Sequence, residues 1–550
     1  MIDKKDNLTL EEYENKFIYT KNKTNLNIKF NRIAFIFFVF LIISIIYSIQ
    51  LFHLGSLKVE NEIKPLVIKK NYRADIIDRN GNYLVKTVSS IDIGINPTDV
   101  INKKKLLINL QLIFPDKDYK DILNKIKKNK YFYLEKKISA DNYEKIMLLG
   151  DKSIKSEEKL TRIYPQRNLF SHIIGQIDDN NSGISGLEKS LNKILKEIKE
   201  PIQLTVDTDI QYLIREELIK FQSIFKSKGS AAILMNVNNG EILSMVSYPD
   251  FDLNKRETIS DLNFINRATK GVYELGSVFK TFTIAAGLEE GLIKTDTEFL
   301  NLKKKLKCGK NIISEYDNKI SSNLTVEQIL IRSGNIGSVR IGQKLGIDKL
   351  RFFLEKIGVL NKIDFDLEEV GEPIPFRWGK CKLATVSFGH GITTTPLQLA
   401  KGYAIIANGG FDIKPSLIKK NLENSKKKRI LKEGVSSQIN KVLRKIVSTK
   451  EGTAGFANIE GYEVGGKTGT AEKAMSGGYT RKAKVNTFAS IFPTSNPKYV
   501  MIVLLDEPKT SEDYVYRYKN KTGSYKGTPF NTAGWTSVEV AGKIIQKIGP

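Results

Sequence analysis

Cysteine, histidine and tryptophan are scarce in this chain of 550 residues, which contains two cysteines, three histidines and two tryptophans. Two cysteines, Cys308 and Cys381, are too few for a disulfide scaffold or a thiolate metal cluster. They could form one bridge in an oxidising compartment, but the expectation is two free thiols. Three histidines, His53, His172 and His390, leave few candidates for a histidine-ligated metal or a Ser-His-Asp triad.

Positive charge exceeds negative charge in this chain, and the net charge of +26 comes mainly from lysine. Hydrophobic residues make up 41% of the chain, and its length predicts two or three domains with globular cores. Isoleucine and asparagine are abundant as well, a combination typical of nucleotide bias, so a solvated surface explains the charge without a partner. Attraction to an anionic polymer or to lipid headgroups is the sharper interpretation. Nucleic acid is not an expected partner, because no basic stripe with interleaved aromatic residues stands out.

One long uncharged run lies near the N-terminus, from Ile33 to Ile49. Extended through Leu54, it reaches the ~20 residues that a transmembrane helix needs. Because the residues before it are basic, the positive-inside rule predicts that residues 1–32 lie in the cytoplasm and that the rest lies outside. A cleaved signal peptide is the alternative, but the leader is too long and no Ala-x-Ala site follows. We therefore predict an uncleaved single-pass anchor over residues 33–54. The preceding basic residues are Lys16, Lys21, Lys23, Lys29 and Arg32.

Two regions follow this anchor, residues 55–200 and residues 201–550. The first is mixed and lysine-rich, and Arg73 to Gly81 predicts a strand that ends in an Asn-Gly turn. A second cluster there, Arg162 to Glu188, predicts turns and packing. The other region predicts helices between two groups of strands, which indicates an antiparallel sheet in an α+β domain. The strands are expected at 231–237, 241–246, 462–471, 486–492 and 499–505, with a last helix at 538–548.

Ser277 and Lys280 form a Ser-x-x-Lys motif, which recurs elsewhere in so lysine-rich a chain. Its context is distinctive, because Gly276 permits a sharp entry into a helix and an apolar run follows from Phe279 to Leu288. A serine in the first turn of that helix lies near free backbone N–H groups. Lys280 shares its face, so its amine can reach the serine oxygen. The lysine can act as a base only when neutral, a state that desolvation and a nearby cation such as Lys467 favour. A capping serine beside a surface lysine is the alternative.

A Ser-x-Asn motif occurs twice, as Ser333-Gly334-Asn335 and as Ser321-Ser322-Asn323. The first has apolar helical residues on both sides, and a buried helix junction can hold polar groups in place. The second lies in a polar stretch. We therefore prefer Ser333 and Asn335, with a helix-capping serine as the alternative.

A Lys-Thr-Gly motif also occurs twice, as Lys467-Thr468-Gly469 and as Lys521-Thr522-Gly523. The second follows the last expected strand and is predicted to be a loop. The first lies in a strand rich in glycine, which lets a substrate backbone approach the strand edge. Lys467 can attract a terminal carboxylate, with the hydroxyls of Thr468 and Thr470 as donors. The alternative is a glycine-bearing strand with an exposed lysine.

These three motifs, in this order, resemble those of penicillin-binding proteins and class A β-lactamases, with Ser-Gly-Asn in the middle position. Asn266 to Phe282 is similar to the active-site segment of division-type class B penicillin-binding proteins. Many members carry proline where Leu275 stands, a difference that affects a turn and leaves the chemistry untouched. Gly389-His390-Gly391 resembles a turn near their site, in which His390 would be structural. Residues 55–200 resemble their non-catalytic pedestal, and the whole resemblance covers residues 70–548.

The resemblance implies the penicillin-binding transpeptidase fold for residues 201–550, after a cytoplasmic segment (1–32), a transmembrane helix (33–54) and a mixed α/β pedestal (dimerisation-like) domain (55–200). It also implies a D,D-transpeptidase that crosslinks peptidoglycan stem peptides through a serine acyl-enzyme during septal cell-wall synthesis. No metal or organic cofactor is implied, and β-lactams would acylate the serine. The catalytic domain would lie in the periplasm, held by the inner membrane, beside a polytopic division glycosyltransferase and other divisome membrane proteins.

The same resemblance implies a role for each motif residue. Ser277 would be the nucleophile and Lys280 its base, while Ser333 would relay a proton to the leaving amine. Asn335 would orient the lysine and the substrate amide. Lys467 completes the implied catalytic set, and the implied substrate-binding residues are Thr468, Gly469 and Thr470.

Three other functions stay open from the sequence. An elongation-type transpeptidase differs only through the residues around Ser277. A β-lactamase would need a deacylating water and a base, and no residue can be assigned to that role. A membrane-anchored β-lactam sensor needs acylation alone, although the 32-residue N-terminus offers little signalling sequence. The intact motifs argue against a scaffold that binds without turnover.

Overall fold

The computed structural model describes residues 25–56, 72–255, 261–309, 311–420, 428–475, 478–517 and 523–549. The chain divides into two units, residues 1–70 and residues 71–550. Residues 1–24 of the predicted cytoplasmic segment lie outside the described residues, as do Lys521 and Thr522 of the second Lys-Thr-Gly motif.

The first unit contains one long helix, α2 (Asn25–Ser56), whose side chains between Arg32 and His53 are exposed. This 22-residue stretch is long and apolar enough to cross a membrane, which agrees with the predicted anchor. The helix begins before residue 33, so the apolar stretch is the central part of a longer helix.

The second unit is built around a five-stranded antiparallel sheet with the strand order β12-β13-β14-β6-β7. All five predicted strands are present, and the Asn-Asn-Gly turn between β6 and β7 is confirmed, with Gly240 at a φ of 78°. The third strand begins at Gly465 rather than at Tyr462, and it forms a long hairpin with β13. The strand bounds are β6 (Gly229–Asn236), β7 (Ile242–Tyr248), β12 (Gly465–Met475), β13 (Gly478–Phe492) and β14 (Tyr499–Asp506).

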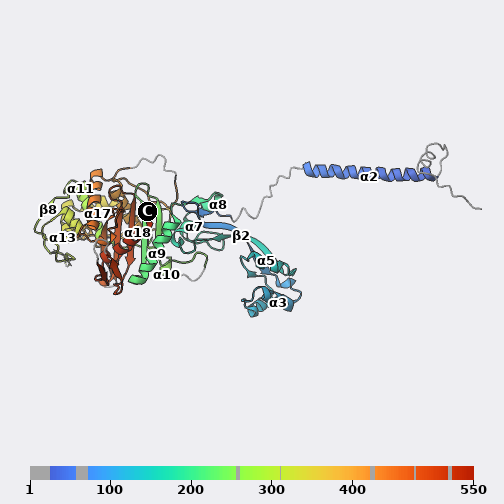
Figure 1. Ribbon diagram of the computed structural model, residues 1–550, viewed down its shortest axis with the longest axis horizontal. Helices are drawn as coiled ribbons and strands as arrows, with labels where there is room; N and C mark the ends of the chain where they lie inside the picture. Colours follow the sequence, from blue (N-terminus) through green and yellow to red (C-terminus); the bar gives the residue numbers. More distant parts are fainter. Residues whose placement is uncertain are drawn as a thin grey trace, which may run out of the picture. The chain divides into compact units, whose positions relative to one another are not determined.

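Helices cover both faces of this sheet, as its nearly unbroken buried strands require. α9 (Thr208–Phe225) and α18 (Ser537–Ile548) pack together on β6, β7 and β14, although they come from opposite ends of the domain (Figure 1). α16 and α17 pack against β13, β14 and β12. The predicted last helix and the insertion of helices between two groups of strands are thus confirmed. The inserted helices are α10 (Asp261–Phe264), α11 (Phe279–Glu289), α12 (Val326–Ile331), α13 (Asn335–Leu345), α14 (Ile347–Lys356), α15 (Lys380–Val386), α16 (Pro396–Ala407) and α17 (Glu433–Ser448).

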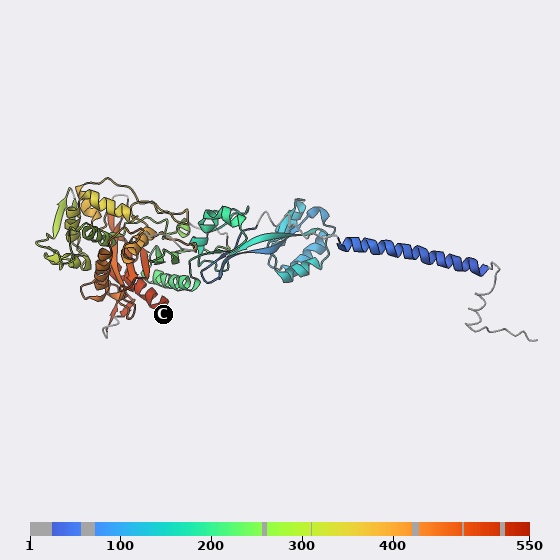
Figure 2. The ribbon, with the colours of Figure 1, turned by 90° about the horizontal axis from the view of Figure 1, so that it is seen from above.

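A second sheet precedes the five-stranded sheet in the chain, in the order β3-β2-β1-β5 with β4 also paired to β2. Its long strands are the blue and teal arrows in Figure 2. The predicted turn after β1 is present, with Gly81 at a φ of 90°. A separate apolar core lies under α3, α4 and α5. The bounds are β1 (Ile76–Ile77), β2 (Tyr83–Ile95), α3 (Lys103–Ile113), α4 (Tyr119–Lys127), β3 (Phe132–Glu135), α5 (Ala140–Met147), β4 (Ile154–Ile163), α6 (Ser171–Ile174), α7 (Gly186–Ser190), α8 (Asn192–Glu197) and β5 (Ile202–Gln203).

Packing in this second sheet depends on one buried charge cluster. The Glu188 carboxylate pairs with Arg73 at 2.6 Å and with Arg162 at 2.7 Å, and all three side chains are almost fully buried. The predicted packing role of this segment is therefore confirmed. Because removal of one partner leaves uncompensated buried charge, such clusters are sensitive to substitution.

The expectation of two free thiols is wrong, because Cys308 and Cys381 form a disulfide with a Cα–Cα distance of 5.4 Å. Cys308 ends β9 (Lys305–Cys308), which pairs with β10 (Asn311–Ser314) in a small hairpin. Cys381 lies in the first turn of α15. Their sequence separation of 73 positions hides this contact from local sequence patterns. The remaining described elements are η2 (Pro97–Asp99), η3 (Gly276–Val278), β8 (Glu298–Phe299), β11 (Leu324–Thr325), η4 (Gly455–Ala457), β15 (Val515–Arg517), β16 (Ser524–Lys526) and η5 (Ala533–Trp535).

Candidate active site

Ser277 lies in the 3-10 turn η3, directly before the buried helix α11, and not in the first α-helical turn that was predicted. The turn packs tightly against β12. Gly276 has a φ of 64°, and a Cβ there would lie 2.7 Å from the Thr470 carbonyl oxygen. A Cβ at Gly469 would lie 2.0 Å from the Leu275 carbonyl oxygen. Glycine on both sides of the contact thus lets the serine turn and the Lys-Thr-Gly strand meet backbone to backbone.

Lys280 is fully buried, and its ammonium points to the middle motif. Its Nζ donates to the Asn335 Oδ1 at 2.7 Å, to the Ser333 Oγ at 3.1 Å and to the Ser333 carbonyl oxygen. Within the described chain none of its hydrogen bonds goes to Ser277, so the direct contact expected from the helical spacing is absent. Desolvation lowers the pKa of Lys280 to about 7, against an opposing effect of Glu315.

Ser333 lies at the junction of α12 and α13, as the flanking apolar residues predicted. It is 4% exposed and has a φ of 55°, in the left-handed region that side chains other than glycine rarely adopt. Backbone strain of this kind persists where the surroundings enforce it, and it is common at functional sites. The competing motif, Ser321 to Asn323, lies in an exposed loop.

Lys467 is also fully buried, and its Nζ donates to the Ser333 Oγ at 2.8 Å and to the Thr468 carbonyl oxygen at 3.0 Å. Two lysine nitrogens therefore flank one serine hydroxyl. Desolvation, and next the repulsion from Lys280, lower the pKa of Lys467 well below its ordinary value. The sequence predicted that desolvation and a nearby cation would both lower the pKa of Lys280; desolvation does so, while Glu315 raises it. Two ammonium groups that share one serine hydroxyl repel each other, so the protonation of either amine depends on that of the other.

The residues that follow Lys467 on β12 present hydroxyls and open backbone at the edge of the sheet. The Thr468 hydroxyl lies 2.8 Å from that of Thr453. The Thr470 Oγ1 accepts the Ala533 backbone N–H at 2.9 Å, which leaves its own proton available to another acceptor. Thr470 thus retains donor capacity for its predicted role in substrate binding, and Thr468 retains it when Thr453 is the donor in the hydrogen bond that they share.

His390 lies on the rim of the site, in a cluster that joins three segments. Its Nδ1 is 3.5 Å from the Glu274 carboxylate, and its ring packs on Tyr479 with centroids 4.4 Å apart. Glu274 also accepts the Tyr479 hydroxyl at 2.7 Å and the Gly391 N–H at 2.9 Å. These contacts hold the Gly-His-Gly turn near the residues before Ser277, in agreement with a structural role for His390.

Sequence reasoning missed Glu315, whose carboxylate accepts the backbone N–H groups of Asn335 at 2.6 Å and of Ile336 at 2.9 Å. It lies directly after β10, in a stretch of mixed polar residues. No local periodicity links such a residue to a helix that begins 20 positions later, so its part in the site is visible only in three dimensions.

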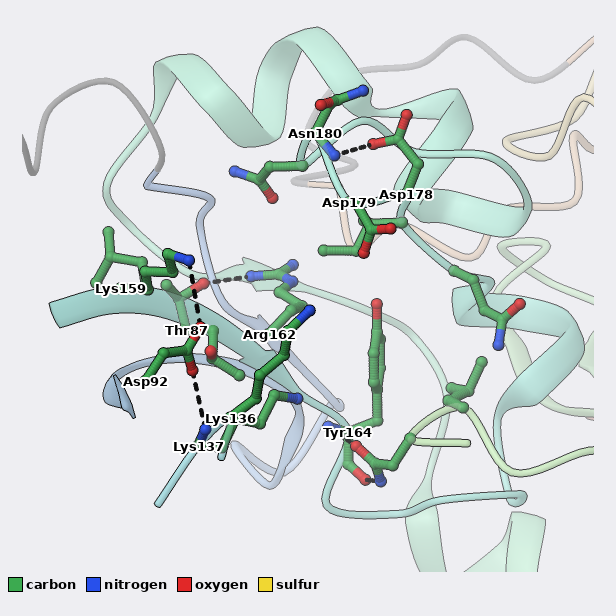
Figure 3. Close-up of a pocket in the computed structure, with 17 residues that line it drawn as sticks. Thr87, Asp92, Lys136, Lys137, Lys159, Arg162, Tyr164, Asp178, Asp179 and Asn180 are labelled. Carbon is green, nitrogen blue, oxygen red and sulfur yellow. Dashed lines mark hydrogen bonds and ion pairs between the residues drawn. The ribbon is translucent and has the colours of Figure 1, made fainter. Parts of the chain in front are cut away.

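A cavity of about 700 Å³ lies away from the three motifs, between β2, β4 and the 176–181 segment (Figure 3). Two of the basic side chains that line it are paired with carboxylates, Lys159 with Asp92 at 3.3 Å and Arg162 with Glu188. None of the predicted site residues lines it. The chemistry-bearing groups instead gather where η3, the α12–α13 junction and β12 converge.

Two family models match the chain. The penicillin binding protein transpeptidase domain matches residues 230–528, and the penicillin-binding protein dimerisation domain matches residues 68–220. The first includes all three motifs.

Two curated relatives match over most of their lengths. The chain is 30% identical over 492 residues to the probable peptidoglycan D,D-transpeptidase FtsI of Caulobacter vibrioides, with 87% of this chain and 81% of that protein covered. It is 30% identical over 551 residues to the peptidoglycan D,D-transpeptidase FtsI of Buchnera aphidicola subsp. Baizongia pistaciae, with coverages of 90% and 95%.

Among solved structures, penicillin binding protein 3 from Mycobacterium tuberculosis, complexed with ampicillin, has the same fold. The TM-score is 0.66 at 22% identity, and the match covers 88% of this chain and 98% of that one. Because the motif-bearing domain, the preceding domain and the overall fold agree, the chain belongs to the class B penicillin-binding proteins, among the division-type peptidoglycan D,D-transpeptidases.

Proposed function

We propose that Ser277 is the residue through which this transpeptidase crosslinks peptidoglycan stem peptides during septal cell-wall synthesis. The Ser277 Oγ attacks the penultimate D-alanine carbonyl while neutral Lys280 takes the hydroxyl proton. The tetrahedral intermediate collapses, the C–N bond breaks, and terminal D-alanine leaves with a proton relayed through Ser333. An amine from a second stem peptide then attacks the acyl-enzyme, its proton returns through the same groups, and the Ser277 hydroxyl is restored.

One observation carries this proposal: two buried lysines flank the Ser333 hydroxyl, with Nζ–Oγ distances of 3.1 Å and 2.8 Å. A chain of amine, hydroxyl and amine can pass a proton either way with little movement of heavy atoms. The pKa of Lys280 near 7 supports a base that is about half neutral at pH 7. Asn335 supports the chain by accepting a hydrogen bond from Lys280 and thereby orienting it.

The direct contact between Ser277 and Lys280 is not required in the resting enzyme. Catalytic hydrogen bonds are often long or misaligned without substrate and tighten when it binds. Ser277 is three residues from Lys280 and lies in the turn that packs on β12. A small rotation of the lysine side chain is the motion that the proposal assigns to substrate binding.

Substrate would bind along β12, the edge strand of the sheet. Thr468 and Thr470 would donate to the substrate carboxylate, and the Lys467 Nζ lies 3.4 Å from the Thr468 hydroxyl oxygen, where it orients that group. Gly469 keeps the strand free of a side chain at the closest approach. The backbone N–H groups of Ser277 and Thr470 would stabilise the developing oxyanion, a contribution typically worth about 10²–10³ in rate per donor.

The membrane placement follows from the N-terminal helix. Residues 1–32 would lie in the cytoplasm, residues 33–54 would cross the inner membrane once, and the rest would lie in the periplasm, because lysine precedes the apolar run. We assign residues 55–200 to a pedestal domain and residues 201–550 to the transpeptidase domain. The proposed partners are a polytopic division glycosyltransferase and other divisome membrane proteins, with stem peptides and β-lactams as ligands.

Labelling of the full-length protein with a fluorescent penicillin tests the nucleophile. We expect a stable covalent adduct in the wild type and none in Ser277→Ala. The matched control is Ser223→Ala, because Ser223-Ile224-Phe225-Lys226 is also a Ser-x-x-Lys motif. The Ser223 hydroxyl donates to the Lys220 carbonyl within α9, so this variant should label like the wild type. Equal labelling of wild type and Ser277→Ala would overturn the assignment.

Turnover separates the remaining functions. A transpeptidase releases D-alanine from a pentapeptide substrate when an acceptor amine is present, whereas a sensor is acylated without turnover. Rapid loss of label from the wild type would instead indicate a β-lactamase. Release of D-alanine that depends on Ser277 and on the acceptor is the expected outcome.

A further inference from the structure

The hairpin β9–β10 presents a carboxylate to the start of the helix that carries Asn335. Glu315 accepts the Asn335 N–H at 2.6 Å and the Ile336 N–H at 2.9 Å. The residue before it, Ser314, accepts the Asn335 side-chain amide at 2.8 Å. On its other side, the Asn335 Oδ1 accepts a hydrogen bond from the Lys280 Nζ at 2.7 Å. Asn335 therefore bridges the hairpin and the buried lysine.

Helix α13 depends on this outside carboxylate for its first hydrogen bonds. The first N–H groups of a helix lack partners within it, and a side chain at the N-cap position usually supplies one. The N-cap here is Gly334, which has no side chain to do so. Glu315 takes over that task from a different element and places its negative charge at the positive end of the helix.

The hairpin is itself fastened to the helical core. Cys308 on β9 is bonded to Cys381 in α15, and α15 packs against α13. Glu315 is thus delivered from a support that is covalently fixed to a neighbour of the helix it caps. This arrangement limits the freedom of the carboxylate and makes its position reproducible.

Glu315 also acts on the charge of Lys280. The groups that face it are Glu315 from the hairpin and Lys467 from β12. Arg332, in the junction before α13, is paired with Asp317 at 3.3 Å. Glu315 therefore supplies negative charge to a region with two buried amines, and it raises the pKa of Lys280 against the effect of burial.

We propose that Glu315 is a positioning residue of the acylation site, which fixes Asn335 at the start of α13 and balances the charge of the buried lysine pair. The inference rests on the proposed roles of Lys280 and Asn335. It extends the site by a carboxylate that touches no reacting atom and acts through its two neighbours.

The test is the rate constant of acylation by a fluorescent penicillin, measured from pH 5.5 to pH 9 in the full-length protein. In Glu315→Gln one of the two backbone acceptors is lost, and we expect the plateau rate to fall by about 10- to 100-fold because Asn335 is misplaced. The neutral side chain also no longer stabilises the Lys280 ammonium. The pH at half-maximal rate should therefore move to lower pH, by about one unit, as is typical when a neighbouring opposite charge is removed.

Glu327→Gln is the matched control. Glu327 lies in the first turn of the adjacent helix α12 and pairs with Lys445 at 2.6 Å, so the variant loses the same charge at a similar place. Both its rate and its pH midpoint should match the wild type. A Glu315→Gln profile that coincides with the wild type in rate and midpoint overturns the proposal.

Thermal melting would reveal whether Glu315→Gln is misfolded. A further variant keeps the proposal testable in that case. Glu315→Asp keeps the charge but is shorter by one methylene, so it cannot reach both N–H groups. We expect a lower plateau rate with an unchanged midpoint, and a wild-type rate would contradict the positioning role. Failure of the proposed function gives a different result, namely equal labelling of wild type and Ser277→Ala.

Discussion

Acylation of Ser277 should depend steeply on pH below neutrality, because its proposed base is a buried lysine. The pKa of Lys280 is about 7 instead of the ordinary 10.5. At pH 7.5 about three-quarters of the enzyme would carry neutral Lys280, compared with about 0.1% for an unperturbed lysine. Burial thus raises the active fraction by roughly three orders of magnitude.

The direction of the pH dependence follows from which protonation state of Lys280 is active. Neutral lysine accepts the serine proton and the ammonium does not, so the rate rises with pH and levels off above the pKa. At pH 5.5 the neutral fraction falls to about 3%, so the acylation rate should be about 25-fold lower than at pH 7.5. The midpoint belongs to the coupled pair of Lys280 and Lys467 rather than to one nitrogen.

The assay measures the rate of acylation by a fluorescent penicillin, by stopped flow or on gels, in buffers of constant ionic strength from pH 5.5 to pH 9. A penicillin carboxylate remains ionised throughout this range, so the slope reports the enzyme. Lys280→Arg is the control, because it keeps a positive charge that cannot be neutralised. Its rate should lie about 10²–10⁴ below the wild-type plateau and should not change with pH over this range. A wild-type rate that is flat across the range, or a midpoint above pH 9, would refute the reasoning.

Three further predictions concern contacts outside the lysine pair. Gly469→Ala should lower the acylation rate about 100-fold with little change in melting temperature, since its Cβ would lie 2.0 Å from the Leu275 carbonyl oxygen and push the serine turn off β12; a wild-type acylation rate would contradict this. Replacing Cys308 and Cys381 by serine should reduce the free energy of unfolding by about 2–4 kcal/mol, measured by denaturant titration under non-reducing conditions; coincident unfolding curves would contradict it. Glu188→Gln should cost about 3–5 kcal/mol because two buried arginines lose their counter-charge, while acylation measured well below the melting temperature stays normal; an unchanged melting temperature would contradict it.

The sheet could be predicted because its strands carry strong local signals. β6 and β7 are apolar runs joined by an Asn-Asn-Gly turn, and Gly240 adopts the positive φ that such a turn needs. β12 was located by its glycines, although its start was placed at Tyr462 and the strand begins at Gly465. The error arises because the residues just before a strand can be extended without pairing, and pairing depends on a partner strand that local sequence does not reveal.

The motif residues could be proposed from sequence, but their contacts could not. Helical spacing placed Lys280 beside Ser277, whereas its hydrogen bonds go to Ser333 and Asn335. The reason is that the α-helix begins at Phe279, so Ser277 occupies a 3-10 turn with a different side-chain direction. A long flexible side chain also chooses its partners from the whole fold rather than from its own helix.

Long-range contacts account for the rest of what the sequence concealed. Cys308 and Cys381 are 73 residues apart, and two cysteines in a chain of 550 residues give no spacing pattern to interpret. Glu315 lies among polar residues that look like any surface hairpin. Both contribute to the support of Asn335, and both become meaningful only once α13 and α15 are packed together.

The placement of two lysines in the interior argues for chemistry rather than stability. An apolar residue at either position would avoid the desolvation that lowers both pKa values, and replacing buried charge by apolar groups is often neutral or stabilising. Strongly perturbed pKa values combined with a strained backbone at Ser333 therefore mark a site at which the fold gives up stability for a poised proton acceptor. Such an arrangement holds only if its surroundings are rigid. We assign part of that rigidity to Glu315, which caps the start of α13 and is fastened through its hairpin to α15.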